Sequence, residues 1–329
     1  MMKRNPVGVL LLAFGGPDSP ESIEPFMTNL MGGRRPSPEL LARVAEKYRL
    51  IGGKSPLLEI TRAQAAALEK VMNAGSGGRH HLPRYRVYVA MRYWHPFIPD
   101  VLQEMAADGV GKAVAISLSP HYSQFTTGAY FAEVQAWLVR KGSAMEVAFA
   151  RDWYHHPLFI QALGEKLAEG RDKFPPRRRE GLPVVFSAHS LPVSYIREGD
   201  PYVEQLQATV HSLARQGNLV TWRLAYQSRG GGGGEWLGPQ VEEVLESLAG
   251  DGHREVLLSP VGFVADHVET LYDVDIALRA HAQRLGLKLE RCAALNTSPA
   301  FIAALAAIAR EGLQEGFMAG PDGGRTGRG

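Results

Sequence analysis

Short apolar runs alternate with amphipathic stretches along almost the whole chain. The runs have the length of buried strands, and we predict strands at Val7–Phe14, Arg86–Ala90, Ala113–Leu118, Met145–Ala150, Val184–Ala188, Thr221–Tyr226, Val256–Ser259 and Lys288–Cys292. Stretches with helical spacing lie between them, and we predict helices at Pro38–Tyr48, Ile60–Asn73, Pro99–Asp108, Thr127–Lys141, Pro157–Asp172, Tyr202–Gln216, Pro239–Ala249, Val268–Arg284 and Pro299–Gly312. Strand–helix alternation is typical of parallel sheets built from β-α-β units.

The predicted strands fall into two sets joined near Arg151–Pro157. We therefore predict an α/β protein with two Rossmann-like domains, each a mainly parallel sheet flanked by helices. The expected bounds are 1–154 for the N-terminal domain, 155–298 for the C-terminal domain and 299–316 for a final helix. Residues 317–329 have almost no apolar content, which predicts a disordered tail.

Acidic residues are concentrated after the Ser259-Pro260 break. On a helix, Glu269 and Asp273 are four positions apart and share a face, and Asp266 adjoins that face. Like charges this close disfavour each other's ionisation unless a cation or a proton lies between them. The pattern predicts a divalent-metal or proton-relay site, and the alternative is a solvated acidic helix face.

A second candidate is His189, which directly follows the predicted strand Val184–Ala188. Residues at the carboxyl ends of strands in open α/β sheets face the ligand crevice. A neutral imidazole at that position can bind a metal or accept a proton near neutral pH. The alternative is a histidine that is merely hydrogen-bonded at a strand end.

Several longer motifs surround these residues. They are Y-R-L-I-G-G-K-S-P-L (Tyr48–Leu57), M-R-Y-W-H-P-F (Met91–Phe97), F-S-A-H-S-L-P (Phe186–Pro192), G-D-P-Y (Gly199–Tyr202), Y-Q-S-R (Tyr226–Arg229), W-L-G-P (Trp236–Pro239) and D-H-V-E-T-L-Y-D (Asp266–Asp273). With these motifs in this order, the chain resembles the ferrochelatase family, whose members insert ferrous iron into a porphyrin in haem biosynthesis. The resemblance runs from about Val9 to about Ala309, and it implies two Rossmann-like domains with the final helix packed back on the first.

The resemblance implies that His189 and Glu269 are catalytic, with His189, Glu269 and Asp273 as metal ligands. His189 would accept a pyrrole proton or ligate the iron, and Glu269 would help strip water from the metal. Asp266 and Asp273 would continue a proton relay. Some relatives have a further glutamate where this chain has Ala277, so an outer metal site is in doubt.

Aromatic and polar side chains near the predicted strand ends are candidates for the porphyrin cleft, although any one of them can instead belong to the core. The residues predicted to bind porphyrin are Phe14, Ser55, Arg92, Tyr93, Tyr122, Tyr130 and Phe263. Arg92 and Lys47 are candidates to pair with propionates. Phe14 stands where relatives differ, which leaves protoporphyrin IX and coproporphyrin III both open.

Composition narrows the cofactors and partners. A formal net charge of +2 gives no argument for nucleic-acid binding. The single cysteine, Cys292, excludes an intrachain disulfide and cannot supply the thiolates of an iron–sulfur cluster. We expect a cytoplasmic monomer that needs no cofactor, has no iron–sulfur cluster and takes Fe²⁺ as a substrate.

The N-terminal segment has some features of a signal peptide. Its apolar run, Val7–Phe14, is only eight residues long, and Gly15-Gly16-Pro17 follows where a small-residue cleavage site would be expected, so we interpret the run as the first strand. No apolar run is long enough to span a bilayer, and peripheral membrane contact stays open.

Three other functions are alternatives to the ferrochelatase interpretation. They are a chelatase for another metal and tetrapyrrole, a non-enzymatic haem or porphyrin carrier, and a nucleotide-dependent oxidoreductase, whose glycine fingerprint this chain lacks.

Overall fold

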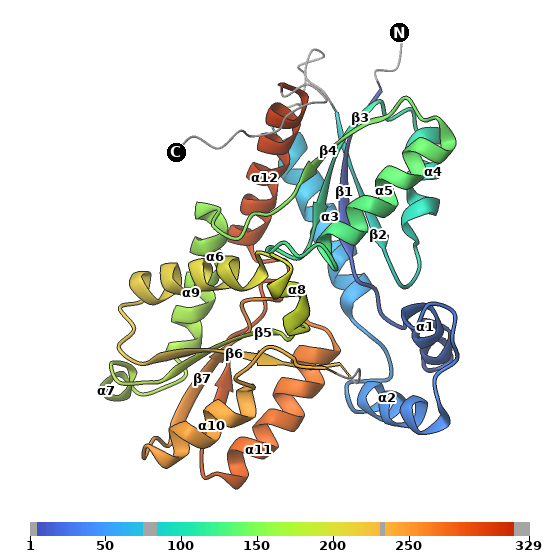
Figure 1. Ribbon diagram of the computed structural model, residues 1–329. Helices are drawn as coiled ribbons and strands as arrows, with labels where there is room; N and C mark the ends of the chain where they lie inside the picture. The colour runs from blue at the N-terminus through green and yellow to red at the C-terminus, as the bar shows by residue number, and fades with distance from the viewer. Residues whose placement is uncertain (1–4, 75–83, 231–233, 319–329) are drawn as a thin grey trace.

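The strands form two four-stranded sheets, each entirely parallel (Figure 1). The structure, a computed structural model, describes residues 5–74, 84–230 and 234–318. The first sheet has the order β2-β1-β3-β4, with β1 at Val7–Ala13, β2 at Tyr85–Met91, β3 at Lys112–Ser117 and β4 at Glu146–Ala150. The second has the order β6-β5-β7-β8, with β5 at Val184–His189, β6 at Trp222–Gln227, β7 at Glu255–Ser259 and β8 at Lys288–Arg291. The predicted fold class is confirmed.

Helices surround both sheets. In the first half of the chain they are the single turn η1 (Pro20–Ser22), α1 (Ile23–Leu30), α2 (Pro38–Leu50), α3 (Leu57–Asn73), α4 (Ile98–Ala107) and α5 (Thr127–Lys141). In the second half they are α6 (Pro157–Arg171), α7 (Pro176–Arg179), α8 (Val193–Arg197), α9 (Tyr202–Gln216), α10 (Val241–Gly250), η2 (Glu269–Leu278), α11 (Arg279–Arg284) and α12 (Pro299–Met318).

Three features of this list differ from the prediction. Helices α1, α7 and α8 were not predicted. The single predicted helix Val268–Arg284 is a π-helix, η2, followed by α11. Helix α12 continues to Met318, into the predicted tail, and residues 319–329 of that tail lie outside the described residues.

Both faces of each sheet are covered, as a parallel sheet requires. Alternate residues of β1 point to opposite faces, and all of residues 9–12 are inaccessible to solvent. Val9 and Leu11 join one large core with α3, α6 and α12, whereas Leu10 and Leu12 pack with α4 and α5. Helix α12 contacts α3, β3 and β4 as well as α6. The division of the chain into domains at residue 154 stays a prediction.

A smaller apolar cluster joins the α1–α2 segment to the second half of the chain. Its buried members include Phe26 on α1, Tyr48 on α2 and Trp94 after β2, and Val268, just before η2, packs against it. Figure 1 shows α1 and α2 apart from the first sheet, and α2 lies on the side of the molecule where α11 lies. Helix α2 also contacts η2. The segment thus lies at the junction between the first sheet and η2.

Within the described residues, no helix is both long and apolar enough to cross a membrane.

Candidate active site

The two strongest candidate residues form a direct contact. His189 is the last residue of β5 and Glu269 is the first residue of η2, and His189 Nδ1 lies 2.9 Å from Glu269 Oε2. Their side chains are 36% and 24% exposed, so the pair is accessible from solvent. In the described part of the chain, His189 Nε2 has no hydrogen-bond partner, and it is not buried away from solvent. Nε2 is therefore the atom that is free to meet a ligand.

Neighbouring strands and helices fix the backbone of both residues. The Tyr202 hydroxyl, at the start of α9, donates to the His189 carbonyl oxygen at 3.0 Å. The amide of Gln227, at the end of β6, donates to the Glu269 carbonyl oxygen at 3.2 Å. A π-helix is wider than an α-helix and occurs frequently at functional sites. In η2 it brings Glu269 against the end of β5.

The surroundings of the His189–Glu269 contact favour an ion pair. Burial alone would raise the pKa of Glu269, but the charge and hydrogen bond of His189, with help from His267 and Ser228, lower it to about 2. Burial alone would lower the pKa of His189, but the charge and hydrogen bond of Glu269 and the charge of Asp273 raise it above its ordinary value. The charge of each partner thus stabilises the opposite charge on the other, and neighbouring cations relieve the expected repulsion among carboxylates.

Asp273 does not join this pair. Its Oδ1 accepts from Lys47 Nζ, on α2, at 2.8 Å, and its Oδ2 accepts from the Ser228 hydroxyl at 2.6 Å. In the described ranges, no three His, Cys, Asp or Glu side chains are grouped so that they could hold a metal ion. The predicted ligand set of His189, Glu269 and Asp273 stays a prediction. Lys47, a candidate for a porphyrin propionate, is paired with Asp273 in this structure.

Asp266 faces another part of the molecule. Its side chain accepts from Asn296 at 2.8 Å and from Thr270 at 3.2 Å, and it lies 3.1 Å from Arg291. Arg291 also binds Asp275 through two hydrogen bonds, at 2.9 and 2.7 Å. No hydrogen bond in the described residues joins Asp266 to Glu269 or Asp273. In this structure the Asp266 carboxylate connects the start of η2 with Arg291 and Asn296, and its part in a proton relay stays a prediction.

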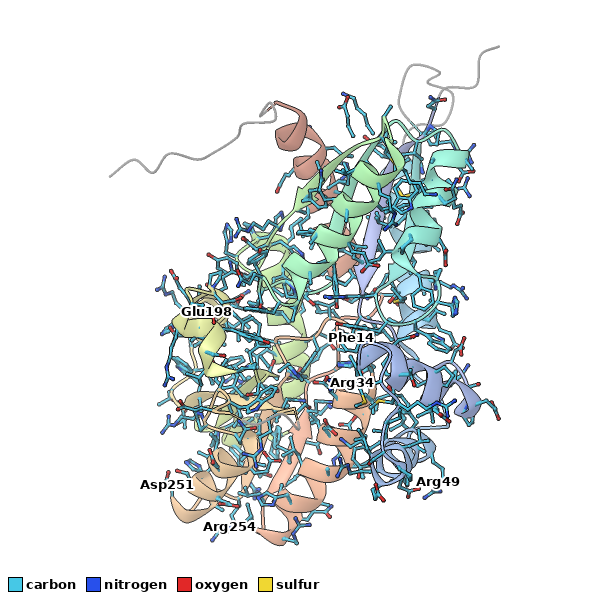
Figure 2. The ribbon with its side chains drawn as sticks, turned by 45° about the vertical axis from the view of Figure 1, so that its right-hand side comes forward. Phe14, Arg34, Arg49, Glu198, Asp251 and Arg254 are labelled. Carbon is cyan, nitrogen blue, oxygen red and sulfur yellow. The ribbon has the colours of Figure 1, made fainter. Side chains whose placement is uncertain are left out.

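The residues predicted to bind porphyrin differ in accessibility. Phe14 follows β1, is 43% exposed, and stands 4.7 Å from Tyr93, measured between ring centroids. Figure 2 shows Phe14 near the middle of the molecule. Arg92 lies over the rings of Tyr93 and Tyr130, at 5.0 and 5.6 Å. Together these residues place an aromatic and cationic surface at the carboxyl ends of β1 and β2.

Two of the predicted contacts are almost closed to solvent. Tyr130 is 4% exposed and belongs to the core under α5, and Ser55 is 5% exposed and accepts from the Leu57 backbone N–H at the start of α3. Neither provides a wall in this structure, so their porphyrin contacts stay predictions. Tyr122 and Phe263 are partly buried; Tyr122 lies under Arg151, and Phe263 lies against His267.

Sequence reasoning missed the residues that hold the pair in place. Tyr202, Gln227 and Ser228 contact His189, Glu269 and Asp273 respectively. The signal was present, since all three belong to the G-D-P-Y and Y-Q-S-R motifs, which had been given no role beyond the resemblance.

Comparison with known proteins agrees with this geometry. The family model Ferrochelatase matches residues 6–313. Ferrochelatase from Geotalea daltonii is 41% identical over 325 residues, which cover 94% of this chain and 98% of that protein. The chain belongs to the ferrochelatase family. It is therefore an enzyme that inserts ferrous iron into a porphyrin in haem biosynthesis, which decides against the carrier and oxidoreductase alternatives.

Other ferrochelatases extend the comparison. Ferrochelatase from Deinococcus radiodurans is 39% identical, covering 94% of this chain and 96% of that protein. Coproporphyrin III ferrochelatase from Oceanobacillus iheyensis is 34% identical, with coverage of 93% and 97%. Among solved structures, SirB from Bacillus subtilis with Fe³⁺ has a TM-score of 0.58 at 12% identity, with coverage of 94% and 96%. That last likeness supports the two-sheet fold alone.

Proposed function

We propose that this ferrochelatase-family enzyme binds its porphyrin at the carboxyl ends of the two sheets and that His189 accepts the pyrrole protons. The observation that carries the proposal is the hydrogen bond between His189 Nδ1 and Glu269, which leaves Nε2 available. An imidazole oriented by a carboxylate on one nitrogen is a typical general base at the other. Glu269 holds the ring in place and stabilises the imidazolium formed when a proton arrives.

The order of proton movements follows from the charge of the pair. Metal insertion requires two pyrrole protons to leave and the iron to lose water. The raised pKa of His189 favours the imidazolium, which carries a proton on both ring nitrogens and is not a base. An imidazolium must therefore release its Nε2 proton to solvent before it can act, while the Nδ1 proton stays in the hydrogen bond to Glu269. The neutral imidazole can then take a pyrrole proton, and Glu269 remains anionic throughout because its pKa is lowered to about 2.

The surface formed by Phe14, Tyr93 and Arg92 supplies the porphyrin wall in this proposal. Aromatic side chains bury large apolar areas, which suits a flat macrocycle. The guanidinium of Arg92 suits a propionate carboxylate, although it now lies over aromatic rings. Binding energy along this wall can be used to distort the macrocycle so that its nitrogens become accessible.

One assay tests the proposed function. Purified protein is mixed anaerobically with ferrous iron and with either protoporphyrin IX or coproporphyrin III, and the absorbance change on metal insertion is followed. Turnover of at least one porphyrin is expected, and the ratio of kcat/KM values identifies the preferred one. Failure with both porphyrins, in protein that is folded by circular dichroism, would overturn the proposal.

Asp273 is expected to matter less than Glu269. Its carboxylate is held by Lys47 and Ser228 and contacts neither His189 nor Glu269 through a hydrogen bond. Asp273→Asn should therefore reduce kcat by less than about tenfold, since a general-base contribution of about 100-fold or more stays intact. A loss as large as that of Glu269→Gln would show that Asp273 belongs to the proton path.

The buried thiol is expected to be dispensable. Cys292 is 2% exposed, and burial raises the pKa of its thiol to about 11, so it is not a reactive thiolate at neutral pH. Cys292→Ser should keep at least about half of wild-type kcat, because no step uses this residue. Acid-labile sulfide in stoichiometric amounts in anaerobically purified wild-type protein would refute the expected absence of an iron–sulfur cluster.

The proposed location is the cytoplasm. A chain whose single cysteine is buried forms no intrachain disulfide and therefore needs no oxidising compartment. A monomeric state and peripheral membrane contact stay predictions, and sedimentation with and without anionic lipid vesicles would test both.

A further inference from the structure

The G-D-P-Y motif carries a buried charged residue that the proposed chemistry does not use. Asp200 is 8% exposed and accepts three hydrogen bonds. The Ser123 hydroxyl and the Gln124 backbone N–H both donate to its Oδ2 at 2.9 Å. The Tyr202 backbone N–H, at the start of α9, donates to its Oδ1 at 3.1 Å. Asp200 therefore joins the second half of the chain to the loop that leaves the first sheet.

That loop, residues 118–126, connects β3 to α5 and lies at the carboxyl end of the first sheet. It is held by α9 at two further points. Gln205 Oε1 accepts from the Tyr122 backbone N–H at 2.6 Å, and the Thr209 hydroxyl lies 2.9 Å from His121 Nε2. Phe125 also stacks on Tyr195 of α8. The position of loop 118–126 is thus fixed by its contacts with α8 and α9.

Helix α9 also holds the catalytic strand. The Tyr202 side chain, from the first position of α9, donates to the His189 carbonyl oxygen at 3.0 Å. Gly199, just before Asp200, has φ +91°, which an L side chain adopts only with strain, and this turn lets the chain pass from α8 into α9. The four residues of the motif therefore fix the start of α9 between His189 and loop 118–126.

We propose that Asp200 is a positioning residue that sets loop 118–126, and with it Tyr122, at a defined separation from His189 for porphyrin binding. The inference rests on the proposed function, which places the porphyrin at the carboxyl ends of the sheets, where loop 118–126 lies. A carboxylate suits the task because it can only accept hydrogen bonds, and all three of its neighbours are donors. No other acidic side chain among the described residues bonds to this loop.

Asp200→Asn tests the inference with almost no change in size. An asparagine has one acceptor oxygen, so either Tyr202 N–H or the Ser123–Gln124 pair would face an NH₂ group. The dissociation constant for protoporphyrin IX or coproporphyrin III, measured without iron by quenching of protein fluorescence, should rise about tenfold. KM for porphyrin should rise in parallel, while KM for ferrous iron should stay within about twofold and kcat should fall by less than about threefold.

Two companion variants separate positioning from general stability. Ser123→Ala removes one donor and leaves the carboxylate in place, so it should raise the porphyrin dissociation constant by a smaller factor, about threefold. Asn73→Ala is the matched control. Asn73 also makes three hydrogen bonds, to Glu69 and twice to Tyr85, but at the amino end of β2. It should lower the unfolding temperature and leave porphyrin binding unchanged.

Each outcome bears on a different claim. Wild-type porphyrin affinity in both Asp200→Asn and Ser123→Ala would overturn the role of Asp200, as would an equal loss of affinity in Asn73→Ala. If Asp200→Asn does not fold, the Ser123→Ala result alone decides. Wild-type protein that neither binds nor metallates porphyrin would instead refute the proposed function.

Discussion

Glutamine in place of Glu269 is expected to lower kcat by about 100-fold or more, the usual size of a lost acid–base contribution. Glutamine keeps the length of the side chain and can still accept a hydrogen bond from His189 Nδ1. It cannot supply the negative charge that stabilises the imidazolium. Porphyrin affinity should stay close to that of the wild type, because Glu269 contributes to the proton transfer and not to the aromatic wall.

The pH dependence gives this variant a second, independent measurement. In the wild type, His189 is active as a base only when neutral, so kcat should rise as the pH passes through its pKa, which lies above the ordinary 6.5. Removing the charge of Glu269 removes the main cause that raises the pKa of His189. The limb in Glu269→Gln should therefore move to lower pH. An unchanged kcat with an unchanged limb would mean that the acidic residues form a solvated helix face.

The same shifts determine where the pair stabilises the fold. The depressed pKa of Glu269 contributes stability that is present above its ordinary 4.5 and is lost as the pH falls towards about 2. The raised pKa of His189 contributes stability that is present below its ordinary 6.5 and is lost as the pH rises through the raised value. The pair therefore stabilises the protein fully between about 4.5 and 6.5, which is below the pH at which turnover should be fastest. The charged form of His189 that stabilises the fold is therefore not the neutral form that acts as the base.

The pattern of the sequence was sufficient for the sheets and for the position of His189. The run Val184–Ala188 is apolar except for Ser187 and is buried throughout, because a parallel strand is covered on both faces. The residue that follows it, His189, lies at the end of the strand, where side chains face the crevice. The helix α1 could also have been found, since Ile23, Phe26 and Met27 have helical spacing and Pro25 falls in the first turn, where proline is tolerated.

The π-helix and the charge pairing could not be predicted in the same way. A spacing of apolar residues does not distinguish α from π geometry over two turns, and η2 is held by partners distant in the chain. Lys47 lies 226 residues before Asp273, and Gln227 lies 42 residues before Glu269. On a predicted α-helix, Asp266 and Asp273 both belong with Glu269. The tertiary contacts instead give Asp266 to Arg291 and Asp273 to Lys47.

Alanine in place of His189 is expected to abolish metal insertion while porphyrin still binds. The substitution removes Nε2, the nitrogen that faces away from Glu269, and it leaves Glu269 Oε2 without its hydrogen-bond partner. A general base typically contributes about 100-fold or more, so residual kcat should lie at or below about 1% of wild type. The measurements are anaerobic turnover with ferrous iron and porphyrin dissociation constants from fluorescence quenching.

The control for this variant is His267→Ala. His267 is two residues before Glu269 and contributes to lowering the Glu269 pKa, but its Nδ1 bonds the Ala265 carbonyl oxygen and its ring lies against Phe263. It should keep more than about a tenth of wild-type turnover, since it supplies no base. Retention of more than about a tenth of turnover in His189→Ala itself would remove His189 from the proton transfer. Glu269 would then remain as the only member of the pair able to act as the base, and its lowered pKa makes it a weak one.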